Sequence, residues 1–500
     1  MPERSVIIIG AGVSGLAAGC YARMNGYPAR IFEHDSEPGG VAKSWKHNDY
    51  LIDGGIHYLM APRPGSVCYD IYRELGVFQN RQYPELATYV QFTDEATGNR
   101  ISFTADLDRL SRDLKAIAPE DAAAIDDFIS GIRSLERTDM FALMETPAEL
   151  AGPLSPLKQM WHIRRSLRYL GGAYNLPAER FVLRFRNDSL RRAMGHLFLP
   201  EVPMWFVLML LSLLSTRQLG LLAGGCADFV ASLAERYSAL GGQLTCNATV
   251  KEIIVEKERA AGVRLEDGSE YRADVVISAN DGYSTIFKML GGRYVEAKVK
   301  RRYQAWKQIS PLVTLSFGVN RTFRDEPPLG FLVLKEPMKI GETTIPGFPI
   351  RIFNYSGAFS PPGKTVIQVL LLTDWQFWNE LISDRPRYDA EKKRVSSEVL
   401  ARLEPHYPGI SSQVEITDIA TPHTTWRFTL NHHGAFMGWR PTPEALRTFF
   451  RKTLPGLDNF YMAGQWVMPG GGVPPCLFSG RHVIQMLCKR DGRRFTTSFA

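Results

Sequence analysis

The sequence has few cysteines, and their spacing predicts neither a metal site nor a set of disulfides. No two of them form a Cys-x-x-Cys pair. The six are Cys20, Cys68, Cys226, Cys246, Cys476 and Cys488. This usage is typical of a reduced, cytoplasmic interior. We therefore expect no metal centre.

Neither a secretory segment nor a membrane-spanning segment is expected from the sequence. The chain starts "MPERSVIIIG", which leads directly into an expected strand rather than a leader peptide. The apolar stretch "MWFVLMLLSLL" at 204–214 has eleven residues, whereas a bilayer span takes about 20. Two interpretations remain for it: a buried helix, or a helix that dips into a membrane surface.

Positive charge is concentrated in one segment. The chain carries a net charge of +7, and residues 151–200 contain nine Lys or Arg against two Asp or Glu. No nucleic-acid-binding motif accompanies this patch, so we expect no nucleic-acid partner. Because the apolar stretch at 204–214 follows directly, the sequence predicts peripheral, salt-sensitive contact with a membrane through about 158–214. We expect a cytoplasmic protein that contacts the inner face of the membrane.

The N-terminal 35 residues predict a dinucleotide-binding unit. A strand at 5–9 leads into Gly10, Gly12 and Gly15, then a helix, then a second strand at 29–34 that contains Glu33. In such units the first glycine permits the turn, the second admits the pyrophosphate and the third lets helix and strand pack closely. The helix N-terminus then faces the phosphates, and Glu33 can accept hydrogen bonds from a ribose.

A second glycine cluster near the C-terminus decides between flavin and nicotinamide. Gly39 and Gly40 follow the second strand and can add backbone N–H groups to the phosphate cradle. "FYMAGQWVMPGGGVPP" at 460–475 reads as a strand, a glycine-rich turn and a helix, and we expect that strand to lie beside the first one. Nicotinamide units are usually complete within one β-α-β block, so two distant glycine clusters favour FAD. The residues expected to bind it are Gly10, Gly12, Val13, Ser14, Gly15, Glu33, His34, Gly39, Gly40, Val41, Val250, Gly464, Gln465, Gly472 and Val473.

These motifs carry a family resemblance that extends over nearly the whole chain. With "YLIDGGIHYL", "GGCADFVASLAERYSALGGQL" and "ADVVISAND", they make the sequence similar to the phytoene desaturase and carotenoid isomerase family of flavoproteins, which includes retinol saturases. The family often has Gly-Gly-Arg after the second strand, whereas Val41 follows here and Lys43 is the nearest cation.

The resemblance implies an α/β fold: a Rossmann-like FAD-binding domain of the glutathione reductase type, with an inserted α+β substrate domain that carries a mixed sheet and helices. We expect FAD-binding segments at 1–80, 220–295 and 455–500. A helical, membrane-facing region is expected at 81–219 and the substrate domain at 296–454.

The resemblance also implies an FAD-dependent oxidoreductase that desaturates, saturates or isomerises a long apolar isoprenoid or polyene in a tunnel. His57, in "GGIHYL", is the candidate catalytic or flavin-contacting residue, because imidazole exchanges protons near neutral pH. His432 and His433 would point to opposite faces of a strand, and Asp281 is expected to cap a turn. Aromatic residues expected near the tunnel are Trp205, Phe206, Trp375, Phe377, Trp378, Trp426, Phe436 and Trp439.

Two alternatives stay open. One is a flavin amine oxidase, which usually shows an aromatic cage. The other is a non-enzymatic isoprenoid carrier that keeps the fold and loses the flavin. The intact "GAGVSG" and Glu33 favour a bound flavin. The sequence carries no signal for an oligomeric state.

Overall fold

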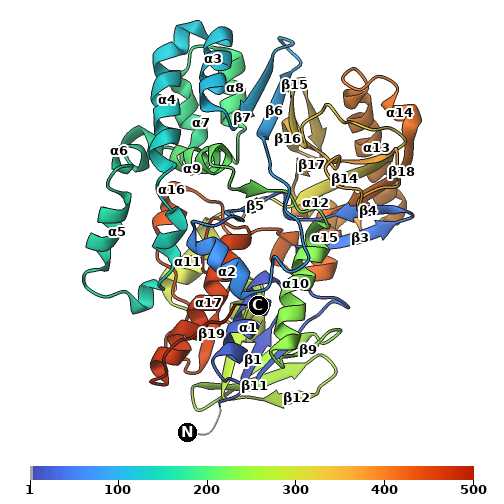
Figure 1. The fold of residues 1–500 in the computed structure, drawn as a ribbon. Coiled ribbons are helices and arrows are strands. Elements are labelled where there is room, and N and C mark those ends of the chain that lie inside the picture. The colour runs from blue at the N-terminus through green and yellow to red at the C-terminus, as the bar shows by residue number, and fades with distance from the viewer. Residues whose placement is uncertain (1–3, 500) are drawn as a thin grey trace.

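A parallel sheet forms the lower part of the protein (Figure 1). The structure is a computed structural model that describes residues 4–499. In spatial order the five strands are β19 (Phe460–Met462), β13 (Val275–Ser278), β1 (Val6–Ile9), β2 (Ala29–Phe32) and β9 (Gln243–Thr245). They come from the start, the middle and the end of the chain, and all neighbours pair in parallel. The Rossmann-like FAD-binding architecture is therefore confirmed.

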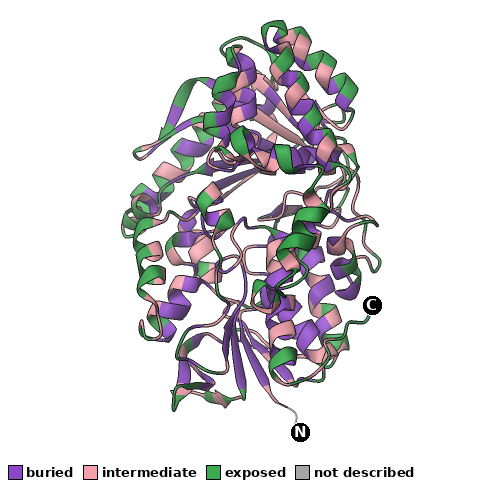
Figure 2. Cartoon of the chain, turned by 90° about the vertical axis from the view of Figure 1, so that its left-hand side faces the viewer, coloured by how far each residue is buried: buried purple, intermediate pink, exposed green. Residues whose placement is uncertain are grey.

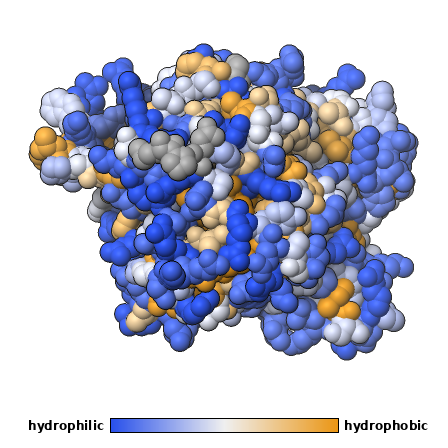
Figure 3. Space-filling model, turned by 90° about the horizontal axis from the view of Figure 1, so that it is seen from below, coloured by the Kyte–Doolittle hydropathy of each residue, from blue (hydrophilic) through white to orange (hydrophobic). Residues whose placement is uncertain are grey.

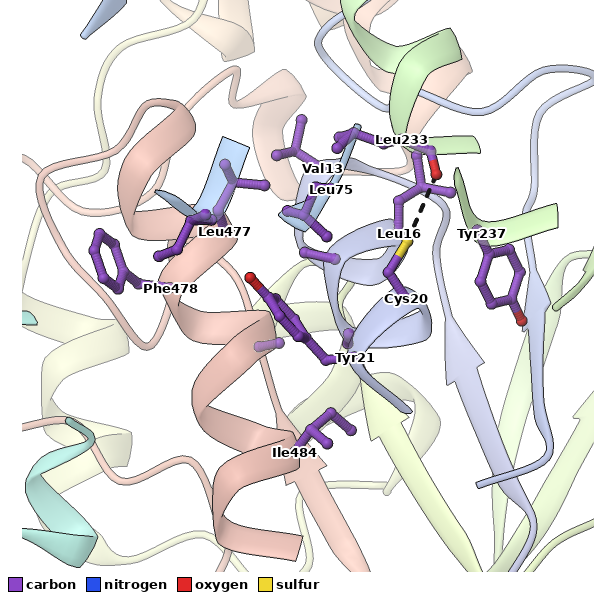
Figure 4. Packing of buried hydrophobic residues seen from close by; sticks show 14 of the residues in the cluster. Val13, Leu16, Cys20, Tyr21, Leu75, Leu233, Tyr237, Leu477, Phe478 and Ile484 are labelled. Atoms are coloured by element: carbon purple, nitrogen blue, oxygen red, sulfur yellow. Dashed lines mark hydrogen bonds between the residues drawn. The ribbon is translucent and has the colours of Figure 1, made fainter. Parts of the chain in front are cut away.

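Helices pack on this sheet, and its central strands are buried along their whole length (Figure 2). The packed helices are α1 (Val13–Met24), α10 (Gly225–Ala239) and α17 (Val473–Arg490). Figure 4 shows Leu16 and Tyr21 of α1 lying between side chains of α10 and α17. Helices α1 and α17 approach closely at Gly480, where a Cβ would lie 2.6 Å from the backbone oxygen of Ser14. The two helices can only hold their N-termini side by side because this position is glycine.

The predicted position of the C-terminal strand in the parallel sheet was wrong. We expected the C-terminal strand to lie directly beside it, but β13 lies between them, pairing Val6 with Val275 and Val276 with Phe460. All three strands are short, apolar and buried, so their composition does not distinguish the central position from the edge.

A seven-stranded sheet lies above the parallel sheet (Figure 1). Its order is β18 (Val414–Ala420), β14 (Leu312–Val319), β17 (Thr365–Leu372), β16 (Thr343–Ile352), β15 (Leu329–Ile340), β6 (Thr88–Asp94) and β7 (Arg100–Thr104). Only β15 and β6 pair in parallel. The core against α12 (Trp375–Leu381) and α13 (Arg385–Leu403) contains the buried Trp378. This mixed sheet was expected, but β6 and β7 come from the segment 81–219, which we had expected to be helical.

A helical layer covers the other part of that segment. It consists of α3 (Leu107–Ile117), α4 (Ala122–Leu135), α7 (Ala178–Phe181), α8 (Asp188–Gly195) and α9 (Met204–Ser215). Helix α9 contains the eleven-residue apolar stretch 204–214, and eight of its twelve residues are buried. The buried interpretation of 204–214 is therefore confirmed and the membrane-dipping one is wrong. Within residues 4–499, the structure contains no helix long and apolar enough to cross a membrane.

The first part of the basic segment lies on α5 (Ser155–Ile163) and α6 (Leu167–Leu170), at the left edge of Figure 1, and its remaining Arg residues lie on or between α7 and α8. Seen from below, most of the surface is hydrophilic, and a hydrophobic group projects on this same left side (Figure 3). Smaller elements surround these two sheets. Strands β10 (Val250–Glu256), β11 (Arg259–Leu265) and β12 (Glu270–Arg272) form a three-stranded sheet, while β3 (Ser44–His47) with β4 (Tyr50–Asp53) and β5 (Leu59–Met60) with β8 (Leu219–Gly220) form two-stranded ones. Further α-helices are α2 (Val67–Glu74), α11 (Ala297–Ala305), α14 (Ile410–Gln413), α15 (Pro422–Thr429) and α16 (Pro443–Arg447).

Candidate active site

One cavity of about 620 Å³ is lined by residues of both sheets. At one end lie the carboxyl ends of the parallel strands, which is where open α/β sheets bind ligands. Nearly all of the predicted cofactor residues line it. They are Gly10, Gly12, Val13, Ser14, Glu33, His34, Gly39, Gly40, Val41, Val250, Gly464, Gln465, Gly472 and Val473, and His57 joins them.

Gly15 is the exception, and its role is packing. A Cβ on Gly15 would lie 1.9 Å from the carbonyl oxygen of Gly10, so only glycine lets α1 approach the turn after β1. Gly12 differs, because a Cβ there would meet nothing in the chain closer than Gly39 O at 4.0 Å. The space in front of Gly12 is therefore kept open toward the cavity.

The N-terminus of α1 offers unpaired donors to that space. Leu16 N–H donates to Gly12 O (3.0 Å), which is the first bond of the helix, so the N–H groups of Val13, Ser14 and Gly15 have no partner within it. These groups and the positive end of the helix dipole favour a phosphate. The N–H of Gly39 is not available for it, contrary to our expectation, because it donates to Ala11 O (3.0 Å).

Glu33 and His34 occupy the end of β2. Glu33 is 5% exposed and accepts hydrogen bonds from the N–H groups of Ala11 (2.6 Å) and Asp35 (3.0 Å). Burial raises the pKa of its carboxyl group, and the two backbone donors oppose that rise. Both ring nitrogens of His34 are engaged, with Thr249 Oγ1 (2.7 Å) and Arg427 O (3.1 Å). Glu33 therefore keeps lone pairs for a ribose, and His34 ties the site to α15.

The C-terminal glycine turn faces the same cavity. Gly464, Gly470, Gly471 and Gly472 all have positive φ, between 65° and 112°, a backbone conformation that side chains disfavour. Gly464 N–H donates to Ser479 Oγ (2.7 Å), which fastens the end of β19 to α17. The turn thereby brings the N-terminus of α17 to the cavity as well.

Asp281 is a cavity residue whose full role the sequence did not indicate. Its Oδ2 accepts from Ser284 N–H (2.7 Å), so the expected cap is confirmed. Its Oδ1 is buried and has no hydrogen-bond partner in the described part of the chain, and the side chain lines the cavity. A buried unpaired acceptor is costly, so this oxygen suits a hydroxyl of a bound ligand. The feature of the sequence that could have indicated this role is an acidic residue shortly after a buried strand.

The other end of the cavity is apolar. Side chains from β6, β14, β15, β16 and β17 form its floor, and the segment before α9 adds a wall. They include Tyr89, Leu197, Phe198, Phe206, Leu312, Leu329, Phe331, Ile345, Leu370 and Leu372. Of the eight aromatic residues expected near a tunnel, only Phe206 and Phe436 line the cavity. Trp378 instead lies in the core between the sheet and helices α12 and α13. The sequence could not separate it from a cavity residue, because core packing and cavity lining use the same residue types.

Comparison with known proteins agrees with this arrangement. Residues 13–485 match the family described as flavin containing amine oxidoreductase. The chain belongs to that family. A prolycopene isomerase of Arabidopsis thaliana is 27% identical over 51% of this chain and 43% of its own length. A lycopene-forming phytoene desaturase of Paracoccus sp. is 24% identical over 97% of both chains. The solved structure of a putrescine oxidase variant superposes with a TM-score of 0.61 at 14% identity, covering 98% of this chain and 99% of that one.

The chain is thus an FAD-dependent oxidoreductase of the flavin-containing amine oxidoreductase family. The residues of the cavity fit FAD: the open space before Gly12 suits the pyrophosphate, and the unpaired Oδ1 of Asp281 suits a hydroxyl of the cofactor. Bound flavin supplies hydride transfer at N5. The protein has to hold it, orient a substrate against it and exclude water.

His57 faces the cavity between the cofactor residues and the apolar floor. Its ring is half-buried and, among residues 4–499, has no hydrogen-bond partner. Burial holds the pKa of His57 well below its usual range, and the nearby positive charge of Arg351 lowers it further. The imidazole is therefore neutral at physiological pH and can donate or accept one proton.

His432 and His433 do not lie on a strand as expected. They form a short turn in which His433 has a φ of 56°, and their rings stack at 3.7 Å between centroids. The described part of the chain contains no cluster of three or more His, Cys, Asp or Glu side chains that could hold a metal ion.

Proposed function

We propose that this flavoprotein acts on the C–C or C=C bonds of a carotenoid-type polyene, by desaturation, saturation or cis–trans isomerisation. The observation that supports it best is the continuity of one cavity from the glycine-rich cofactor end onto the apolar face of the seven-stranded sheet. An apolar ligand on that floor would leave water, which stabilises it by about 25 cal/mol per Å² of buried surface. Relatives named for prolycopene and phytoene support the substrate class.

In this proposal the two glycine clusters hold opposite parts of FAD. The turn at Gly10–Ser14 with Gly40 binds the pyrophosphate, and Glu33, His34 and Val250 surround the adenosine. Gly464, Gln465 and the turn before Val473 contact the flavin half. His57 serves as the flavin-contacting or proton-exchanging side chain. Its neutral, unpartnered ring beside the cavity supports this role.

An amine substrate is the second candidate, because the family is described by amine oxidoreductases and a putrescine oxidase shares the fold. The charges of the cavity favour the polyene. The acidic side chains that line it, Glu33 and Asp281, both lie at the cofactor end. Arg351, a cation, lies at the edge of the apolar floor and would repel a protonated amine.

We also propose that α5 makes a peripheral contact with a membrane. A water-insoluble polyene is easily taken up from the bilayer at such a contact. Leu154, Leu157, Met160 and Trp161 are each more than half exposed, at 56–68%. Leu154, Leu157 and Trp161 are spaced as one face of a helix, and Lys158 adds positive charge beside them. An exposed apolar face next to basic residues is typical of helices that lie in a bilayer interface.

The test of the substrate class uses the FAD-loaded protein with prolycopene, phytoene and putrescine in parallel. We expect the absorption spectrum of a polyene to change and putrescine to leave the oxidised flavin spectrum unaltered. Bleaching of the flavin by putrescine alone would establish the amine oxidase instead. A protein purified without flavin, which binds polyene but cannot take up FAD, would establish the carrier.

A further inference from the structure

Arg351 is a buried cation at the edge of the apolar floor of the cavity. It is 3% exposed, lies on β16 and lines the cavity next to His57. Taking a charge out of water costs several kcal/mol unless neighbours compensate it. A buried cation adds nothing to the binding of a hydrocarbon. The residues that Arg351 contacts therefore indicate its role.

Arg351 begins a row of polar side chains across three strands. It pairs in register with Gln368 of β17, which pairs with Ser316 of β14. Arg351 Nη1 donates to Gln368 Oε1 (2.8 Å), and Gln368 Nε2 donates to Ser316 Oγ (3.0 Å). Each member therefore fixes the orientation of the next one.

This row holds the loop between β4 and His57. Arg351 Nη2 donates to the backbone oxygen of Ile56 (3.2 Å), and Gln368 Nε2 donates to that of Asp53 (2.8 Å). From the other side, Ile56 N–H donates to Cys226 Sγ (2.9 Å). The backbone on both sides of Gly54 and Gly55 is thus anchored, directly before His57.

Asp53 compensates the charge of Arg351 from behind the loop. Its Oδ2 lies 3.6 Å from Arg351 Nη2 and its side chain is fully buried. Its Oδ1 accepts from Ser44 Oγ (2.7 Å) and from Cys226 N–H (2.7 Å). The carboxylate is therefore held by β3 and α10, and the pair is fixed from both sides.

The loop also touches the segment that contains Gly39, Gly40 and Val41. A Cβ on Gly55 would lie 2.8 Å from the backbone oxygen of Val41, so the two stretches are in close contact. Any displacement of the loop would move His57 relative to the cofactor end of the cavity. In contrast to Arg351, the His57 ring has no partner of its own among the described residues that would set its position.

We propose that Arg351 is a positioning residue: through Ile56 and Gln368 it fixes the 53–57 loop so that the His57 ring faces the ligands in the cavity. Its charge has a second effect, because a fixed cation beside the ring favours neutral imidazole. The other titratable groups around the loop stay neutral or paired. Burial raises the pKa values of Cys226 and Tyr355, and Asp53 remains opposite Arg351.

The test separates charge from geometry with two substitutions in the FAD-loaded protein. Arg351→Lys keeps the charge and loses the forked hydrogen bonds to Ile56 and Gln368. Arg351→Gln removes the charge and leaves Asp53 buried alone, so Asp53→Asn with Arg351→Gln is made beside it to preserve folding. Arg81→Gln is the matched control, because Arg81 also forms an ion pair, with Asp228 (3.0 Å), but does not line the cavity.

Two readouts are measured: the pKa of His57 by NMR of histidine-labelled protein, assigned with His57→Gln, and the Kd for prolycopene. In the Asp53→Asn/Arg351→Gln protein we expect the pKa of His57 to rise toward 6.5. In Arg351→Lys it should stay low. Both proteins should bind prolycopene at least tenfold more weakly than wild type. Arg81→Gln should match wild type in both readouts.

An unchanged pKa of His57 and an unchanged Kd in both Arg351 proteins would overturn the inference. So would equal effects from Arg81→Gln. The inference rests on the proposed function only through the choice of prolycopene. If wild type does not bind this polyene, the substrate proposal fails, while the pKa of His57 still decides the role of Arg351.

Discussion

A Cβ atom on Gly15 would lie 1.9 Å from the carbonyl oxygen of Gly10, whereas one on Gly12 would meet nothing closer than 4.0 Å. Two glycines of one motif therefore serve different purposes. Gly15 is required by the contact between α1 and the preceding turn. Gly12 borders a space that no atom of the chain fills, and a side chain at this position would enter that space.

Gly12→Ala should leave the apoprotein intact and weaken FAD binding at least tenfold. The φ of Gly12 is −69°, which alanine adopts readily, so the backbone carries no strain. The added methyl group would occupy the approach of the pyrophosphate. Urea unfolding of the apoprotein and fluorescence titration with FAD measure the two effects. Wild-type affinity for FAD in this variant would show that the phosphate lies elsewhere.

Gly15→Ala should destabilise the protein with or without FAD, by about 1–3 kcal/mol, because the methyl group overlaps a backbone oxygen that can move only with its strand. The free energy of unfolding of the apoprotein is the deciding measurement. If Gly15→Ala unfolds like wild type and loses only FAD affinity, the packing explanation is wrong.

The buried His482 should make the protein less stable below neutral pH. Burial lowers its pKa to about 3, with Lys452 lowering it further, and its Nε2 bonds to Met144 O (2.6 Å). An unfolded chain takes up this proton near pH 6.5, so between pH 6.5 and 3 the unfolded state binds more protons and stability falls with pH. By pH 5 this amounts to roughly 2 kcal/mol.

Urea unfolding of wild type and His482→Gln at pH 7 and pH 5 tests that contribution. Wild type should lose about 2 kcal/mol more than the variant over this interval. His432, whose pKa burial lowers to about 4, acts in the same direction in both proteins and cancels in the difference. Parallel losses in wild type and His482→Gln would contradict the prediction.

Charge reversal on α5 and just after it should abolish low-salt binding to anionic liposomes. Lys158, Arg164 and Arg165 are exposed, and each basic residue near an anionic surface contributes on the order of 1 kcal/mol. Arg168 is left unchanged because it pairs with Asp127 (2.8 Å). The measurement is flotation with anionic liposomes at low salt, which compares wild type with the variant that carries Lys158→Glu, Arg164→Glu and Arg165→Glu.

Reversal of Lys300, Arg301 and Lys393 is the matched control, since these exposed residues lie outside α5. The control protein should float with anionic liposomes as wild type does. Trp161→Ser should weaken the part of the binding that survives at 1 M salt, where the screening length is only about 3 Å. Flotation of the α5 triple variant equal to that of wild type would assign the basic segment to another contact.

Local patterns predicted most of the residues that line the glycine-rich end of the cavity. The glycines and Glu33 were found because the turn, the helix start and the acid are all encoded within 35 consecutive residues. The contribution of β6 to the seven-stranded sheet was missed, because its parallel partner β15 lies more than 200 residues away. Arg351 was missed for the same reason: its partners Gln368, Ile56 and Asp53 converge only in the folded chain.

The order of the parallel sheet has a consequence for biosynthesis. Strands β1 and β2 are synthesised long before β19 and α17, and the turn between these two later elements lines the same cavity as the turn after β1. Long-range pairing of this kind is slow to form. The apolar surface of β13 and α1 therefore stays uncovered until β19 and α17 have been synthesised. During that interval the chain is exposed to aggregation and depends most on chaperones.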